Sequence, residues 1–150
     1  VRGAKTGFVA ASIVPNDVRS VTDVVIVPVD GPEVGTGSTR LEAGTATKLV
    51  LNMITTGAMI RLGKTYGNLM VDLRATNNKL TDRSERIVVE VCGVSRDDAR
   101  RLLEDADKSV KTAIVMQKLG VSRSEAPDAL EKAGGVIRRA MPDAPPPIPH

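Results

Sequence analysis

The sequence has very few of the residues on which disulfide, histidine and aromatic chemistry depend. It contains one cysteine, one histidine and no tryptophan, and aromatic residues make up 1% of it. A single cysteine, Cys92, excludes an internal disulfide and gives no sign of an oxidising compartment, so we expect a structural, at least half-buried residue. Because His150 is the only histidine, metal binding and general-base catalysis by histidine are almost excluded, and we expect no metal site.

Nucleic-acid and membrane partners have little support in the composition. The 150 residues carry a net charge of +3, and both signs are interspersed along the chain rather than gathered in one block. The scarcity of aromatic residues leaves no platform on which bases would stack. No apolar run approaches the roughly 20 residues of a membrane span, and the first residues lack the apolar core of a secretory signal. We therefore expect a cytoplasmic protein with neither partner.

Two short apolar segments near the beginning of the chain are typical of strands in an α/β protein. Residues 5–12 and 24–29 are apolar and bounded by turn residues, as in parallel strands that are buried on both faces. Two strands alone do not make a stable parallel sheet, which needs further strands and helices over both faces. We expect the sheet to be completed by residues outside this chain or by another chain, and the chain itself to be part of a longer protein.

A glycine-rich loop precedes the longest predicted helix. The loop covers residues 31–37, the helix is predicted from about residue 40 to residue 62, and Thr39 and Glu42 have the spacing of a capping box. Apolar residues cover much of the helix circumference, so we expect the helix to be largely buried. Such a loop at a helix N-terminus is able to cradle an oxyanion or a sugar, although its composition fits an ordinary capped loop equally well.

The second half of the chain is predicted to be helical and contains an internal repeat. After a connector over residues 63–74, we expect a helix over residues 77–91. Residues 93–106 then match residues 120–133, and each copy opens with a serine N-cap followed three residues later by an acidic residue. The pattern predicts a compact set of short helices.

The segment from Gly31 to Asp72 contains several distinctive motifs, which include Gly31-Pro-Glu-Val, Thr36-Gly-Ser-Thr-Arg-Leu and the segment 57–72. These motifs resemble those of the N-acetylmuramic acid 6-phosphate etherases of the sugar isomerase domain superfamily. What this family implies is an α/β fold in which a partial doubly wound parallel-sheet sugar isomerase domain precedes a small all-helical domain. The implied boundaries are 1–75 for the carboxy-terminal half of the sugar isomerase domain, 76–141 for the helical domain with its repeat, and 142–150 for a disordered proline-rich tail.

The function that the resemblance implies is that of a lyase in cell-wall recycling. It would cleave the D-lactyl ether of N-acetylmuramic acid 6-phosphate with water, giving N-acetylglucosamine 6-phosphate and D-lactate without a metal or cofactor. Such proteins are cytoplasmic, and the resemblance implies a homodimer with the phosphosugar as its partner. In the family, the acid–base glutamates lie in the amino-terminal half of the domain. The resemblance thus implies that this chain contains no catalytic residue and is inactive alone.

The substrate-binding residues implied by the family are Ser38, Thr39 and Arg40, with Glu33 close by. The two hydroxyls would bond to sugar hydroxyls or to the phosphate, whereas Arg40 would hold charge or brace the loop. For Glu33, a structural carboxylate at the base of the loop is an equal alternative to a direct role. Two further candidates, each with a structural alternative, are Lys48 and Asn68.

The loop departs from the family pattern at three positions. Apolar residues are usual where Asp30 and Gly35 stand, and a lysine is usual where Glu42 stands. Glu42 improves the helix cap but adds negative charge near a candidate anion site, where about 0.3–1 kcal/mol is at stake. Two other classes of function remain open, a non-catalytic phosphosugar-binding regulator resembling the glucokinase regulatory protein and a helical interaction module over residues 93–140.

Overall fold

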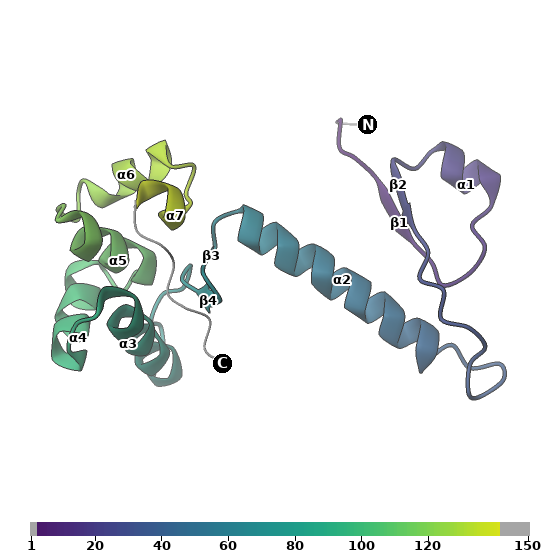
Figure 1. Ribbon diagram of the computed structural model, residues 1–150, viewed down its shortest axis with the longest axis horizontal. Coiled ribbons are helices and arrows are strands. Elements are labelled where there is room, and N and C mark those ends of the chain that lie inside the picture. Colours follow the sequence, from purple (N-terminus) through teal and green to yellow (C-terminus); the bar gives the residue numbers. More distant parts are fainter. Residues whose placement is uncertain (1–2, 142–150) are drawn as a thin grey trace. The chain divides into compact units, whose positions relative to one another are not determined.

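The computed structural model describes residues 3–141, which fall into two compact units. Unit 1 ends at Gly57 and unit 2 begins at Ala58, so the boundary lies within the longest helix (Figure 1). None of the helices in the described part of the chain is long and apolar enough to cross a membrane. In chain order the elements are β1 (Gly7–Val9), α1 (Asn16–Ser20), β2 (Val24–Ile26), α2 (Glu42–Arg61), β3 (Thr65–Tyr66), β4 (Leu69–Met70), α3 (Asn78–Cys92), α4 (Arg96–Asp105), α5 (Val110–Leu119), α6 (Ala126–Lys132) and α7 (Ile137–Ala140).

Unit 1 contains a small parallel sheet of β1 and β2, connected through α1 (Figure 1). The Asp23 carboxylate fixes the start of β1, because it accepts hydrogen bonds from Lys5 Nζ at 2.9 Å and from Thr6 N–H at 2.8 Å. The predicted parallel pair is confirmed. The expectation that both strands are buried on both faces is wrong for the described residues, since each strand is three residues long and only half-buried or exposed. Val14 is the one buried apolar residue that the structure describes in unit 1.

The long helix α2 also differs from its prediction. It was expected to be largely buried, yet none of its residues is buried. The described part of the chain supplies no layer that covers its apolar side chains, so these stay in contact with solvent. The large apolar side chains exposed on or beside α2 are Leu41, Leu49, Leu51, Met53, Ile54, Met59, Ile60 and Leu62.

Unit 2 is built around α3, α4 and α5, which pack on one another and are joined by α6 and α7 (Figure 1). The helix predicted over residues 77–91 is confirmed as α3. The Asn77 side chain caps it by accepting the Leu80 N–H at 2.9 Å, and Gly93 ends it in a left-handed conformation at φ 70°. The core buries Tyr66, Val71, Ile87, Val88, Val91, Ala99, Leu103, Ala106, Val110, Ala113, Ile114, Val115, Ala126, Ile137 and Met141.

The two copies of the repeat begin differently. In the first copy the Ser95 hydroxyl accepts the Asp98 N–H at 3.1 Å, which confirms the predicted cap of α4. In both copies the serine hydroxyl donates to the acidic side chain three residues later at 2.6 Å, but in the second copy α6 starts without a side-chain cap. The expectation of one shared capping device is therefore wrong for the second copy, although Pro127 stands in the first turn of α6 as expected.

Residues 58–75 belong to unit 2, although the predicted domain boundary lies after them. They contain the antiparallel hairpin β3–β4, whose turn uses a left-handed Gly67 at φ 59°. Two side chains from this segment, Tyr66 and Val71, are buried in the core of the helical unit, and Ala75 is buried as well. The connector thus packs with the helices that follow it.

Cys92 is half-buried near the end of α3, as expected of a structural cysteine. Burial raises the pKa of its thiol to about 11, which keeps the thiol protonated at neutral pH. The proline-rich tail over residues 142–150, predicted to be disordered, lies outside the described residues and includes His150.

Candidate functional site

The loop before α2 is held by Glu33. One oxygen of its carboxylate accepts the Glu42 N–H at 3.1 Å, and the other accepts the Ala43 N–H at 3.0 Å. These are N–H groups at the start of α2, which have no partner within the helix. The Glu42 carboxylate does not reach back towards Thr39 but accepts the Val34 N–H at 3.3 Å. The predicted Thr39–Glu42 capping box is therefore replaced by a carboxylate from the base of the loop.

Glu33 and Glu42 also interact with each other through their carboxyl groups. The hydrogen bond with the Glu42 side chain, followed by those from the backbone of residues 43 and 42, holds the pKa of Glu33 below its usual value. The same bond to Glu33 raises the pKa of Glu42. The pair resembles an acid and a base with separated pKa values, but both groups are engaged in bracing the loop.

Ser38, Thr39 and Arg40 are exposed at the tip of the loop, directly before α2. The backbone holds the tip in a turn, because Ser38 N–H donates to the Gly35 carbonyl at 2.9 Å and the Thr39 carbonyl accepts the Gly44 N–H at 3.1 Å. Among residues 3–141, the three side chains have no hydrogen-bond or ion-pair partner. They are free to contact a ligand, and their role in substrate binding stays a prediction. Lys48 is likewise exposed, on α2.

A first hollow lies in unit 1 where β1 and β2 end. Its volume is about 400 Å³, and its lining includes Ser12, Arg19 and Asp30. Asp30 Oδ2 is shielded from solvent and has no hydrogen-bond partner within the described residues. Ligands of open α/β sheets commonly bind beyond the carboxyl ends of the strands, which is where this hollow lies. Asp30 thus places a carboxylate in this hollow.

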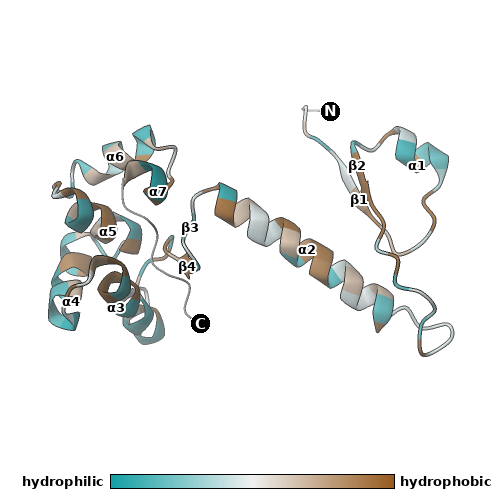
Figure 2. Cartoon of the chain, viewed as in Figure 1, coloured by the Kyte–Doolittle hydropathy of each residue, from teal (hydrophilic) through white to brown (hydrophobic). Residues whose placement is uncertain are grey.

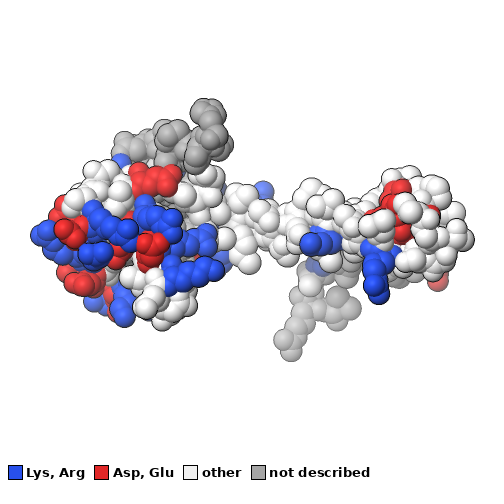
Figure 3. All heavy atoms as spheres, turned by 90° about the horizontal axis from the view of Figure 1, so that it is seen from below, with Lys and Arg blue, Asp and Glu red and all other residues white. Residues whose placement is uncertain are grey.

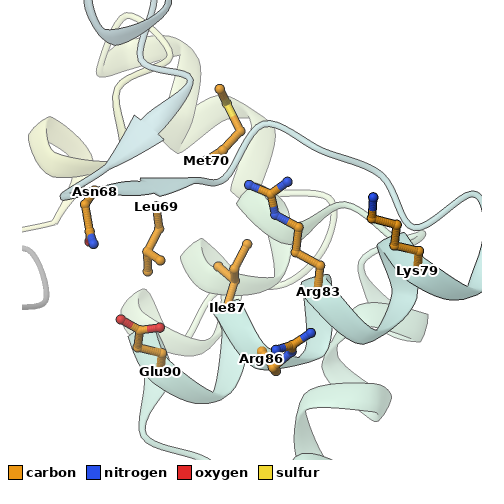
Figure 4. A pocket seen from close by; sticks show the side chains of 8 residues that line it. All are labelled: Asn68, Leu69, Met70, Lys79, Arg83, Arg86, Ile87 and Glu90. Carbon is orange, nitrogen blue, oxygen red and sulfur yellow. The ribbon is translucent and has the colours of Figure 1, made fainter. Parts of the chain in front are cut away.

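A second hollow lies in unit 2 between the β3–β4 hairpin and α3 (Figure 4). Its volume is about 390 Å³, within the range of small-molecule sites. Asn68, one of the candidates from the sequence, lines it from the hairpin, with Leu69 and Met70 beside it. The helix contributes side chains at positions 79, 83, 86, 87 and 90, which share one face because they recur at helical spacing.

The second hollow carries an excess of positive charge. Lys79 and Arg83 have no ion-pair partner in the described part of the chain, whereas Arg86 pairs with Asp82. Glu90 at the other end is its one acidic side chain. Two cations without an ion-pair partner, beside the apolar side chains of Leu69, Met70 and Ile87, suit a ligand that combines an anionic group with an apolar or sugar body. This site was not predicted from the sequence, although the basic residues Lys79, Arg83 and Arg86 recur at helical spacing on one face of α3.

A network of ion pairs beside this site neutralises other arginines of unit 2. Glu85, whose side chain is 5% exposed, accepts from Arg96 Nε at 2.6 Å and from Arg100 Nε at 2.9 Å. Asp82 pairs with Arg96 as well as with Arg86. The surface of the helical unit therefore shows both signs interspersed, as predicted, rather than one basic field (Figure 3). Within the described residues, no group of three or more His, Cys, Asp or Glu side chains is placed to hold a metal ion.

Comparison with curated proteins shows which family the chain resembles. It is 58% identical over 103 residues to the N-acetylmuramic acid 6-phosphate etherase of Rhodopirellula baltica, and 51% identical over 140 residues to that of Brucella anthropi. These matches cover 68% and 93% of the chain. The chain belongs with the carboxy-terminal part of the N-acetylmuramic acid 6-phosphate etherases. No protein-family model matches it.

The chain spans less than half the length of these etherases. The matches cover 34% of the Rhodopirellula baltica protein and 45% of the Brucella anthropi protein. A third etherase, from Mycolicibacterium smegmatis, is 55% identical over 119 residues, with 79% of the chain and 40% of the relative covered. More than half of each relative therefore lies outside the match.

Proposed function

We propose that the protein to which this chain belongs is an etherase, a carbon–oxygen lyase that cleaves the D-lactyl ether of N-acetylmuramic acid 6-phosphate. The observation that carries the proposal is an identity of 50% and 51% with two proteins of that name, over 89% and 93% of the chain. The products of the proposed reaction are N-acetylglucosamine 6-phosphate and D-lactate. Water, acid–base groups and the phosphosugar are sufficient for it, without a metal or cofactor.

The chain is proposed to supply one wall of the sugar site through Ser38, Thr39 and Arg40. Hydroxyl groups both donate to and accept from sugar hydroxyls, and a guanidinium binds phosphate or carboxylate oxygens in a fixed fork. The absence of other partners for these three side chains among residues 3–141 supports this role. Glu33 is assigned to the support of the loop, because both of its carboxylate oxygens already accept backbone N–H groups of α2.

The acid–base groups of the reaction are proposed to lie in the part of the relatives outside the match. Proton removal and return require two carboxyl groups with separated pKa values at the reacting carbon. Glu33 and Glu42 have such values, but each is bound to the other and to the backbone around the start of α2. The 150 residues alone are therefore expected to be inactive.

The finer features of the family are proposals as well. We propose that unit 1 is part of a sugar isomerase domain, supported by the parallel pair β1–β2 and its connection through α1. We also propose that the whole protein is a cytoplasmic homodimer. Sedimentation of the whole protein tests whether it is a homodimer, and a monomer would contradict the proposal.

Release of D-lactate from N-acetylmuramic acid 6-phosphate by the whole protein tests the activity and the sugar wall together. The double variant Ser38→Ala/Thr39→Ala is expected to lower kcat/KM at least tenfold, because two hydrogen bonds to the substrate are lost. Ser20→Ala, an exposed serine of α1, is the matched control. Unchanged turnover in the double variant contradicts the assignment of Ser38 and Thr39 to the sugar site. Activity of the 150 residues alone contradicts the proposal that the acid–base groups lie outside the match. Phosphosugar binding without lactate release favours the regulator instead.

The basic hollow of unit 2 is proposed as a further anion site of the same protein. Lys79→Ala is expected to raise the Kd for N-acetylglucosamine 6-phosphate about tenfold, because a charge-assisted hydrogen bond is lost. Lys132→Ala removes an exposed lysine of α6 and is the matched control. Equal Kd values for the two variants in titration calorimetry exclude the hollow as a ligand site.

A further inference from the structure

The hollow between the β3–β4 hairpin and α3 has opposite charges at its two ends. The cations Lys79 and Arg83 line one end, whereas the Glu90 carboxylate and the Asn68 amide line the other (Figure 4). The helix that supplies both charges is amphipathic, with hydrophobic and hydrophilic residues along its length (Figure 2). A purely anionic ligand would be attracted to one end of the hollow and repelled by the other. The hollow therefore favours a ligand whose two ends differ in charge.

Glu90 is available to bind a ligand. The basic residue one turn before it, Arg86, pairs with Asp82 instead. Within the described part of the chain, the Glu90 side chain forms neither an ion pair nor a hydrogen bond. A carboxylate without a partner accepts its strongest hydrogen bonds from a cationic donor. The chemical group that complements this end of the hollow is therefore an amino group.

The spacing along α3 sets the length of such a ligand. Arg83 and Glu90 are seven residues apart, which corresponds to about two helical turns and about 10 Å. A hydrogen bond takes about 3 Å at each end, so about 5 Å remain for the body of the ligand, roughly the span of one sugar ring. The apolar side chains of Leu69 and Ile87 lie between the two ends and suit the C–H groups of a ring.

We propose that this hollow binds amino-sugar phosphates, with the phosphate at Lys79 and Arg83 and the amino group at Glu90. The phosphate has three strong acceptor oxygens, which are enough for both cations. An N-acetylated amino sugar keeps an N–H donor at the same carbon but has no charge there, so it fits the hollow and binds less tightly. The inference rests on the proposed anion site of this hollow and names the group that occupies its other end. It is independent of lactate release, which involves the sugar wall of unit 1.

The test compares two ligands that differ only at the carbon bearing the amino group. Glucosamine 6-phosphate carries an ammonium group there at neutral pH, whereas glucose 6-phosphate carries a hydroxyl. In titration calorimetry with the 150-residue chain, the Kd is expected to be at least about fivefold lower for glucosamine 6-phosphate. The physical reason is the charge-assisted hydrogen bond that the ammonium group donates to Glu90.

Two variants test whether Glu90 causes the preference. Glu90→Gln is expected to reduce the preference for glucosamine 6-phosphate to less than about twofold, because the neutral amide removes the charge that attracts the ammonium group. The Kd for glucose 6-phosphate should change by less than about threefold in this variant, which shows that the cationic end is intact. Glu131→Gln removes the same charge from an exposed position of α6 and is the matched control, in which the preference is retained.

Three results would overturn the inference. Equal Kd values for the two ligands in the unaltered chain would mean that the hollow does not recognise the amino group. A preference that survives Glu90→Gln unchanged would place the amino group elsewhere. Absence of measurable binding of either ligand would overturn the anion site as well, whereas lactate release by the whole protein would still be decided by its own assay.

Discussion

Unit 1 and unit 2 come from one chain, yet they bury very different amounts of apolar surface. In unit 2 side chains such as Ile114 and Ile137 are fully buried, whereas in unit 1 Val14, at 3% exposed, is the one buried apolar side chain among the described residues. Both units form the elements that their sequences specify locally, since strands, caps and helices appear in each. The difference shows that element formation and core formation have separate requirements. A core needs every layer of the fold, and among residues 3–141 only the helical unit supplies them.

The largest effect should come from removing core volume in the unit that has a core. Ile114→Ala is expected to lower the free energy of unfolding of unit 2 by about 3 kcal/mol, because it leaves a cavity at a fully buried position. Ile13→Ala, at a residue of unit 1 that is 95% exposed, should change stability by less than about 0.5 kcal/mol. Urea unfolding followed by circular dichroism measures both. Equal losses of unfolding free energy in the two variants would contradict the difference in core burial between the units.

A smaller effect should come from the ion-pair network of unit 2. Glu85→Gln is expected to cost about 1–2 kcal/mol, because the neutral amide weakens two hydrogen bonds from arginine side chains that are themselves half exposed. Glu90→Gln, on the same helix but exposed, should cost much less and is the control. Unfolding at neutral pH compares the two, and a larger loss for Glu90→Gln would contradict this account of Glu85.

The same network sets the acid sensitivity of unit 2. Arg100 and then Arg96 hold the pKa of Glu85 below its usual 4.5, and Arg96 and then Arg86 lower the pKa of Asp82 from 3.8. Lowered pKa values in the folded state give stability above the unfolded values, which is lost as pH falls through the folded ones. The unfolding free energy should therefore decline below about pH 4.5, and less steeply in Glu85→Gln. A pH series of melting temperatures checks both slopes.

The smallest effect separates a serine that caps a helix from one that does not. Ser95→Ala should cost unit 2 about 1 kcal/mol, because the Asp98 N–H loses its acceptor. Ser38→Ala in unit 1 should leave stability unchanged, since its hydroxyl has no partner in the described part of the chain. Thermal unfolding of both variants distinguishes them, and a loss in Ser38→Ala would mean that the loop tip is structural rather than free for ligand.

The sequence predicted those features whose causes lie within a few residues. The helix predicted over residues 77–91 is found as α3, because the Asn77 cap and the left-handed Gly93 set its limits locally. The pair β1–β2 was predicted from two short apolar runs. The burial of α2 was predicted wrongly, because the pattern shows that a face is apolar but not whether these residues cover it. The cap of α2 by Glu33 was not predicted as such, since the carboxylate comes from nine residues before its nearest partner.

The candidate site was likewise predictable only in part. The loop residues Ser38, Thr39 and Arg40 were chosen by resemblance, and the structure adds that they are exposed and unpartnered among residues 3–141. The basic hollow of unit 2 depends on the hairpin β3–β4 lying against α3, so it required tertiary structure. In the sequence alone, Lys79 and Arg83 have the pattern of ordinary surface charges on a helix. Only the position of the hairpin shows that they line a shared hollow.

The half-buried Cys92 makes the chain suitable for chemical labelling. Because its pKa is raised from 9.0 to about 11, its reactive thiolate is about 100-fold scarcer at neutral pH than that of an unperturbed thiol. A cysteine introduced at position 53, where the native methionine is 65% exposed, would therefore be alkylated selectively without removal of the native thiol. The rate of that alkylation would then report directly on whether anything covers α2, in a cell extract as well as in purified protein.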